Sequence, residues 1–186
     1  AGVYEVTQAE YEKLTGRNPS YFKAPSHPVE SVTWYDAVKF CEALTGQEKA
    51  LGVLPTGYRY RLPTDQEWNE LVGDQKLDGA ISSLFDRQKS TAPVGSLAPN
   101  VHGLYDVRGN VWEWVNDWYS QTIVNRIQRD GATATSEWVG TDRKVLRGGA
   151  WNRSSQFDLE VANRMAARPS AEDRYDVGFR VMLMRD

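Results

Sequence analysis

Few side chains in this sequence are suited to nucleophilic or redox chemistry. There is one cysteine, Cys41, and there are two histidines, His27 and His102. The histidines lack the i, i+4 spacing of a helical metal site, so we interpret both as loop residues with structural hydrogen bonds. Neither a G-x-S-x-G nucleophile elbow nor a G-x-x-x-x-G-K-[S/T] phosphate loop is present, although composition leaves a Ser–His–Asp triad open.

Oxygen ligands are better represented, in the stretch LYDVRGNVWEW at residues 104–114. Asp106 and Glu113 flank a tight turn at Gly109 and Asn110, and such a turn can direct backbone carbonyls inward. Calcium takes about six to eight oxygen ligands from carboxylates and carbonyls. The stretch therefore suggests a structural calcium site. The alternative is that Glu113 accepts backbone N–H bonds and holds the loop together.

The segment from residue 151 to residue 176 mixes apolar, charged, small and aromatic residues without a helical or strand period. A close-packed core restricts side-chain volume, so we predict that this segment forms a binding surface. In the alternative interpretation, Met165 or Phe157 is buried. The candidate ligand-binding residues are Trp151, Arg153, Ser154, Ser155, Phe157, Asp158, Met165, Ala166, Arg168, Tyr175 and Asp176.

Three helices are predicted to support these residues, because a threonine is followed three residues later by an acid at the start of each. This spacing is the capping box of a helix N-terminus. The pairs are Thr7 with Glu10, Thr33 with Asp36 and Thr64 with Glu67, and the expected helix ends are Gly16, Gly46 and Gly73. In the second helix Cys41 lies on an apolar stripe, so we expect it to be a small buried hydrophobic residue.

Strands are predicted at residues 110–119, 144–149 and 177–185, and VYEVT at residues 3–7 is expected to pair with the last of them. Residues 74–105 follow no period and read mostly as loop. The chain is therefore predicted to be a single α+β domain over residues 1–186, with few helices, a small twisted antiparallel sheet and much loop. The expected core includes Trp34, Trp68, Trp112, Trp114, Phe179 and Val181.

Net charge and hydropathy argue against two kinds of partner, a nucleic acid and the interior of a membrane. The net charge of −3 argues against nucleic-acid binding, and no apolar run is long enough for a membrane span. No signal peptide is visible at Ala1, and a cell-surface or secreted location is favoured if a signal was removed.

Several motifs occur in an order that resembles the formylglycine-generating-enzyme, or sulfatase-modifying-factor, family. They are YEVTQAEYEKLTGRNPSYF, HPVESVTWYDAVKFCEALT, YRLPTDQEWNEL, GLYDVRGNVWEWVNDWY, VLRGGAW and DVGFRVM, which together run from residue 4 to residue 183. The resemblance implies a C-type-lectin-like fold. The family includes copper-dependent oxidases that modify a substrate cysteine, relatives with an iron site, and non-catalytic ligand binders. The binders include variable proteins of bacterial and phage diversity-generating retroelements.

The resemblance also implies roles for individual positions. The two copper-binding cysteines of the oxidases match Arg153 and Asp158, neither of which can bind Cu(I), so no copper is expected. The calcium site of related enzymes matches Asp106, Gly109, Val111 and Glu113. The diversified segment of the variable proteins matches residues 151–176, with the ANR motif at residues 162–164 and the GFR motif at residues 178–180 as its fixed frame.

The sequence therefore predicts a non-catalytic protein that binds an unknown protein or small-molecule ligand through a surface which a retroelement could diversify. The alternative is a metal-dependent oxidoreductase with ligands other than cysteine.

Overall fold

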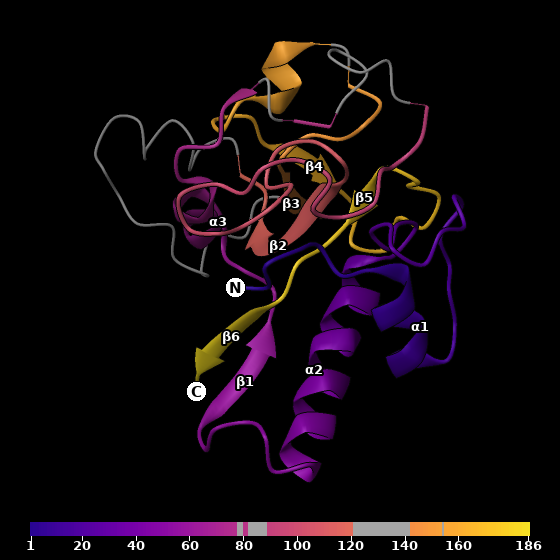
Figure 1. The fold of residues 1–186 in the computed structure, drawn as a ribbon, viewed down its shortest axis with the longest axis vertical. Coiled ribbons are helices and arrows are strands. Elements are labelled where there is room, and N and C mark those ends of the chain that lie inside the picture. Colours follow the sequence, from indigo (N-terminus) through magenta and orange to yellow (C-terminus); the bar gives the residue numbers. More distant parts are fainter. Residues whose placement is uncertain (78–79, 82–88, 121–141, 154) are drawn as a thin grey trace.

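The computed structural model describes residues 1–77, 80–81, 89–120, 142–153 and 155–186. Two helices, α1 (Gln8–Thr15) and α2 (Trp34–Ala50), pack against each other on one side of the molecule, and a third helix, α3 (Asp65–Val72), lies beside the central sheet. The N-terminal segment runs beside residues 179–181 (Figure 1), because Gly2 N–H donates to Val181 O and Val6 N–H donates to Phe179 O. The predicted contact of residues 3–7 with the last predicted strand is present, but residues 3–7 form no strand, and β6 pairs with β1 instead.

The three predicted capping boxes are all present. In each, the threonine side chain accepts from the third backbone N–H of the helix, and the acid accepts from the threonine N–H. Helix α1 is followed by Gly16 in the left-handed conformation, as expected. Helix α2 continues beyond Gly46 to Ala50, so the predicted end was wrong. A glycine inside a helix costs about 1 kcal/mol relative to alanine, which the packing of the rest of α2 offsets.

Strands form a four-stranded sheet and a separate strand pair. The four-stranded sheet has the order β4 (Met165–Ala167), β3 (Lys144–Arg147), β2 (Trp112–Trp118) and β5 (Val177–Gly178). Strands β1 (Tyr58–Arg61) and β6 (Met182–Arg185) form an antiparallel pair. The predicted strand at residues 177–185 is therefore divided between two sheets.

Three of the four strand pairings are antiparallel, as expected, but β5 runs parallel to β2. A parallel pair requires a crossover connection, which here includes β3, β4 and the segment that precedes β5. Within the described residues between 74 and 105, no α-helix or extended strand occurs, and residues 78–79 and 82–88 of that predicted loop lie outside the description. A short 3₁₀ helix, η2 (Gln156–Leu159), precedes β4.

The core consists of two clusters on either side of the sheet strands. Trp112, Trp114 and Phe179 lie in the larger one and Trp68 lies in the smaller one, all at most 1% exposed. These four core predictions are confirmed. Trp34 and Val181 only pack against the larger cluster and stay partly exposed.

A buried ion pair joins the end of the chain to the sheet. Arg180 Nη2 lies 2.7 Å from Glu113 Oε1, and both side chains are almost completely buried. Arg180 also donates to the backbone carbonyls of Gly2 and Tyr105. One guanidinium therefore connects the N-terminal segment, the loop before β2, and β2 itself.

Candidate ligand-binding surface

Four aromatic rings from two distant segments form a cluster, here called the aromatic patch: Tyr21, Phe22, Trp151 and Tyr175. The Phe22 ring meets Trp151 edge to face, with ring centroids 5.3 Å apart, and Tyr21 lies 6.0 Å from Tyr175. Trp151 and Tyr175 are 6.1 Å apart, and Trp151 Nε1 donates to Tyr175 O. Tyr21 is 72% exposed and Tyr175 is 46% exposed, so the patch presents aromatic area to solvent.

The loop that carries Tyr21 and Phe22 is held from beneath by buried polar groups. Glu30, which is fully buried, accepts a hydrogen bond from Phe22 N–H at 2.8 Å and another from Ser31 Oγ. Gln8 of α1 donates from Nε2 to Phe22 O at 2.7 Å. Burial raises the pKa of Glu30 despite these hydrogen bonds. The two aromatic residues therefore stand on a fixed support.

Sequence reasoning from the 151–176 segment missed Tyr21 and Phe22. Their contacts with that segment link positions more than a hundred residues apart, and no short-range pattern contains such information. The available signal was compositional, because the loop NPSYF places two adjacent aromatic residues after turn-forming Asn, Pro and Ser. Isolated aromatic residues in a polar loop indicate a contact with another segment or with a ligand.

Asp176 lies beneath the surface. It is only 4% exposed, whereas we expected it to contact a ligand directly. Its carboxylate accepts from Arg153 Nη2 at 2.6 Å and from Arg174 Nε at 2.9 Å, and these partners keep its pKa below the ordinary value although burial alone would raise it. Arg174 Nη2 in turn lies 3.9 Å from Met165 Sδ. Asp176 therefore holds the predicted contact residue Arg153 directly, and Arg174 connects it to Met165.

The other predicted contact residues occupy neighbouring parts of the same segment. Phe157 lies on η2 with 68% of its surface exposed, and Asp158 follows it at intermediate exposure. Ser155 Oγ accepts from Phe157 N–H and so begins η2. Ala166 is on the edge strand β4, and exposed Arg168 pairs with exposed Asp142. Ser154 lies outside the described residues.

The frame motif at residues 162–164, in contrast, is held by ion pairs and hydrogen bonds to α3 and β3. Arg164 forms an ion pair with buried Asp65, the first residue of α3, and Arg147 of β3 pairs with the same carboxylate at 2.6 Å. Arg147 also donates to the carbonyl of Asn163 at 2.7 Å. The guanidinium groups of Arg147 and Arg164 therefore fix the backbone of the segment in which the irregular residues lie.

A groove of about 750 Å³ adjoins the aromatic patch and shares Tyr21 with it. Its walls are polar and include Tyr35, Lys39, Glu172 and Asp173, which are all exposed. This volume is within the range of small-molecule and peptide sites. The aromatic patch and the groove together offer contact area, charge and hydrogen-bonding groups.

The thiol of Cys41 is buried, and His27 is held by a hydrogen bond within the protein. Cys41 lies in the larger core cluster and is 2% exposed, as predicted. Burial raises its pKa to about 12, so little of the reactive thiolate is present at neutral pH. His27 Nδ1 is hydrogen-bonded to Thr91 Oγ1. Among the residues that the structure describes, no three His, Cys, Asp or Glu side chains gather in a way that could hold a metal ion.

At the predicted calcium site, the carboxylate of Glu113 is paired with the guanidinium of Arg180. Both oxygens of Glu113 accept from Arg180 at 2.7–2.9 Å, and Trp68 Nε1 donates to Glu113 Oε2. Asp106 Oδ2 accepts from Gly95 N–H, and only its Oδ1 is buried without a hydrogen-bond partner. A calcium ion would have to share Glu113 with a guanidinium, so these side chains fit calcium poorly. The calcium site remains a prediction.

The tight turn itself is present. Gly109 and Asn110 have φ values of 86° and 57°, which place both in the left-handed region. Asn110 Nδ2 donates to buried Glu5, and Val111 N–H donates to the same carboxylate. The turn is therefore held by a carboxylate from the N-terminal segment, which the sequence alone did not indicate.

Several known proteins are similar to this chain in sequence or in fold. The chain is 29% identical over 202 residues to the formylglycine-generating enzyme of Streptomyces coelicolor, covering 94% of this chain but only 58% of that enzyme. It is 26% identical over 204 residues to the chaperone protein LppX of Paenibacillus barcinonensis, covering 81% of this chain and 68% of LppX. The solved structure of Treponema denticola variable protein 1 superposes with a TM-score of 0.77 at 26% identity, over 98% of this chain and 82% of that one.

The described part of the chain contains no helix with the length and hydropathy of a membrane span. The fold is C-type-lectin-like, of the subtype found in formylglycine-generating enzymes and variable proteins. A family model for the sulfatase-modifying factor enzyme 1-like domain matches residues 2–185. The chain therefore belongs to the sulfatase-modifying-factor domain family.

Proposed function

We propose that this domain is a non-catalytic ligand-binding protein, and that its binding surface consists of the aromatic patch with the exposed residues of the 151–176 segment. The observation that carries the proposal is the placement of the patch. Its exposed rings, Tyr21 and Tyr175, lie beside Asp176, whose buried carboxylate pairs with Arg153, and Arg153 matches one of the two positions at which related oxidases hold a copper-binding cysteine. Aromatic and arginine side chains are the types that contribute most to binding at protein interfaces.

The oxidoreductase alternative has less support. The family resemblance favours it, but it needs metal ligands other than cysteine, because the one cysteine is buried in the core. Over the ranges that the structure describes, no three His, Cys, Asp or Glu side chains are placed to hold such a metal ion. Diversification by a retroelement is the finer part of the proposal, supported by the likeness to a variable protein and by the irregular residues on a fixed frame.

A combined substitution of exposed surface residues tests whether the segment is free to vary. The variant Phe157→Ser, Asp158→Asn, Ala166→Ser and Arg168→Gln should change the free energy of unfolding by no more than about 0.5 kcal/mol per site. These side chains are exposed or partly exposed, and the ion pair of Arg168 is on the surface. Urea unfolding monitored by circular dichroism gives the value.

The matched control lies in the same segment. Asp176→Ala should lower the free energy of unfolding by about 1–3 kcal/mol, because it leaves the half-buried Arg153 and Arg174 without their shared carboxylate. If any one of the four surface substitutions, made singly, costs as much stability as this control, the segment is part of the core and the binding proposal fails.

A further inference from the structure

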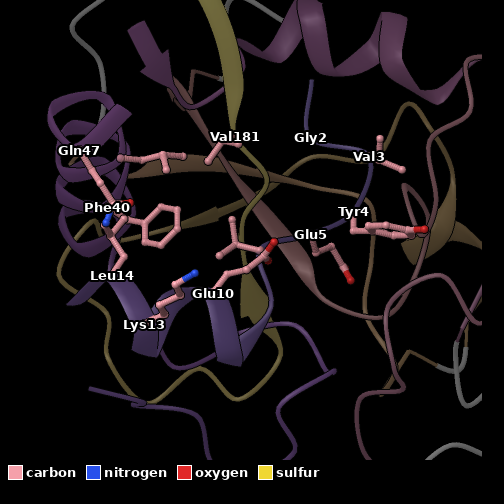
Figure 2. A pocket seen from close by; sticks show the side chains of 12 residues that line it. Gly2, Val3, Tyr4, Glu5, Glu10, Lys13, Leu14, Phe40, Gln47 and Val181 are labelled. Atoms are coloured by element: carbon pink, nitrogen blue, oxygen red, sulfur yellow. The ribbon is translucent and has the colours of Figure 1, made fainter. Parts of the chain in front are cut away.

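A second concavity, separate from the aromatic patch, lies between the N-terminal segment and helices α1 and α2. It has a volume of about 410 Å³, within the range of small-molecule sites, and shares no residue with the aromatic patch. Figure 2 shows Leu14, Phe40 and Gln47 on one side of it and Val3 and Tyr4 on the other. The proposed function makes no use of this cavity.

The walls are mainly apolar and partly open to water. Leu14 from α1, Leu44 from α2 and Val181 before β6 are each partly exposed, and Val3 is 45% exposed. Phe40 lies deeper, at 3% exposed. A concave, mainly apolar site with a few polar groups at its edge is the usual form of a small-molecule site.

The two acidic groups of the cavity make hydrogen bonds within the protein, and Glu10 remains exposed at the rim. The Glu10 carboxylate accepts from Thr7 N–H at 2.8 Å and from Thr7 Oγ1 at 2.7 Å in the capping box of α1. Glu5 is 1% exposed and accepts from Asn110 Nδ2 and from Val111 N–H. Burial, with Asp106 and Glu113 nearby, raises its pKa.

The remaining polar groups at the rim are a cation and an amide. Lys13 in the last turn of α1 and Gln47 of α2 are exposed, and neither makes an ion pair or a side-chain hydrogen bond with any residue that the structure describes. The methylene stem of a lysine can cover apolar surface while its ammonium group meets an anion at the edge. The Lys13 end of the rim thus offers a cation beside an apolar body, although the rim also carries the Glu10 carboxylate.

We propose that this cavity binds an amphipathic carboxylate, of the class of medium-chain fatty acids, with the apolar chain against Leu14, Phe40, Leu44 and Val181 and the carboxylate at Lys13. Gln47 provides an additional N–H donor to the head group. A ligand with a cationic head would meet an unpaired ammonium group at the same place.

Isothermal titration calorimetry with three probes tests this site on the whole chain. Dodecanoate should bind saturably with one site per chain, whereas dodecyltrimethylammonium and dodecanol should bind at least about tenfold more weakly, a difference of about 1.4 kcal/mol. Lys13→Gln should weaken dodecanoate binding by about the same factor. Lys49→Gln removes an equal charge from the last turn of α2, outside this cavity, and should leave binding unchanged.

The apolar half is tested by Leu44→Gln, a partly exposed position whose substitution should weaken all three probes together. Melting curves of each variant, followed by circular dichroism, establish that the fold is retained. Tyr175→Ser alters only the aromatic patch and should bind dodecanoate as the wild type does, so this site and the proposed ligand-binding surface can fail independently. Equal binding of dodecanoate and dodecyltrimethylammonium, an unchanged affinity in Lys13→Gln, or the lack of saturable binding would each overturn the proposal.

Discussion

Replacing Arg180 with methionine is expected to lower the free energy of unfolding by about 3–5 kcal/mol, because removing one partner of a buried ion pair leaves an uncompensated charge. Arg180 is 0% exposed and makes all its contacts within the protein. It faces Glu113 directly, and Glu5 and Asp106 lie close enough to raise its pKa against the effect of burial. Without it, these carboxylates lack their shared cation. Equilibrium urea unfolding at neutral pH measures the loss.

A double variant separates charge from packing. The double variant Arg180→Met, Glu113→Gln removes both members of the pair and should recover part of the lost stability. A loss below about 1 kcal/mol in the Arg180→Met protein would show that the pair is not buried as described.

Replacing Trp114 with alanine is expected to lower the free energy of unfolding by about 3–5 kcal/mol as well, for a different reason. The ring is 0% exposed within the larger core cluster, and its Nε1 donates to Val32 O at 3.0 Å. The substitution leaves a cavity and an unsatisfied carbonyl. Thermal and chemical unfolding should agree on the size of the loss.

Trp118 in the same strand is the matched control. It is 40% exposed, so Trp118→Ala should cost clearly less, about 1 kcal/mol, most of it from the lost contact with Lys144. Equal losses at Trp114 and Trp118 would contradict the difference in burial between the two rings.

Local signals in the sequence were sufficient for the helix starts and for most of the core. Thr7, Thr33 and Thr64 cap their helices through contacts three residues away, and such contacts can be read directly from spacing. The end of α2 could not be predicted from Gly46, because the helix continues where tertiary packing outweighs the cost of a glycine.

The site was harder to predict because its parts come from distant segments. The 151–176 segment was recognised by its irregularity, but Phe22 reaches Trp151 only through the folded chain. Asp176 was taken for a contact residue, since an acid in an irregular segment does not reveal that two arginines will bury it. The partner of Glu113 was missed for the same reason, because Arg180 is 67 residues away.

The central claim is that an exposed surface on a fixed frame binds a ligand, and a selection experiment tests it most directly. A yeast-display library randomised at Phe157, Asp158, Ala166, Arg168 and Tyr175 would be selected against lysozyme, beside a library randomised at the buried frame positions Arg147, Arg164, Asp176, Phe179 and Arg180. We predict that most clones of the first library remain displayed and that specific binders emerge, while most clones of the second are lost. Loss of display in the first library, or a well-displayed library that yields no binder, would contradict the account.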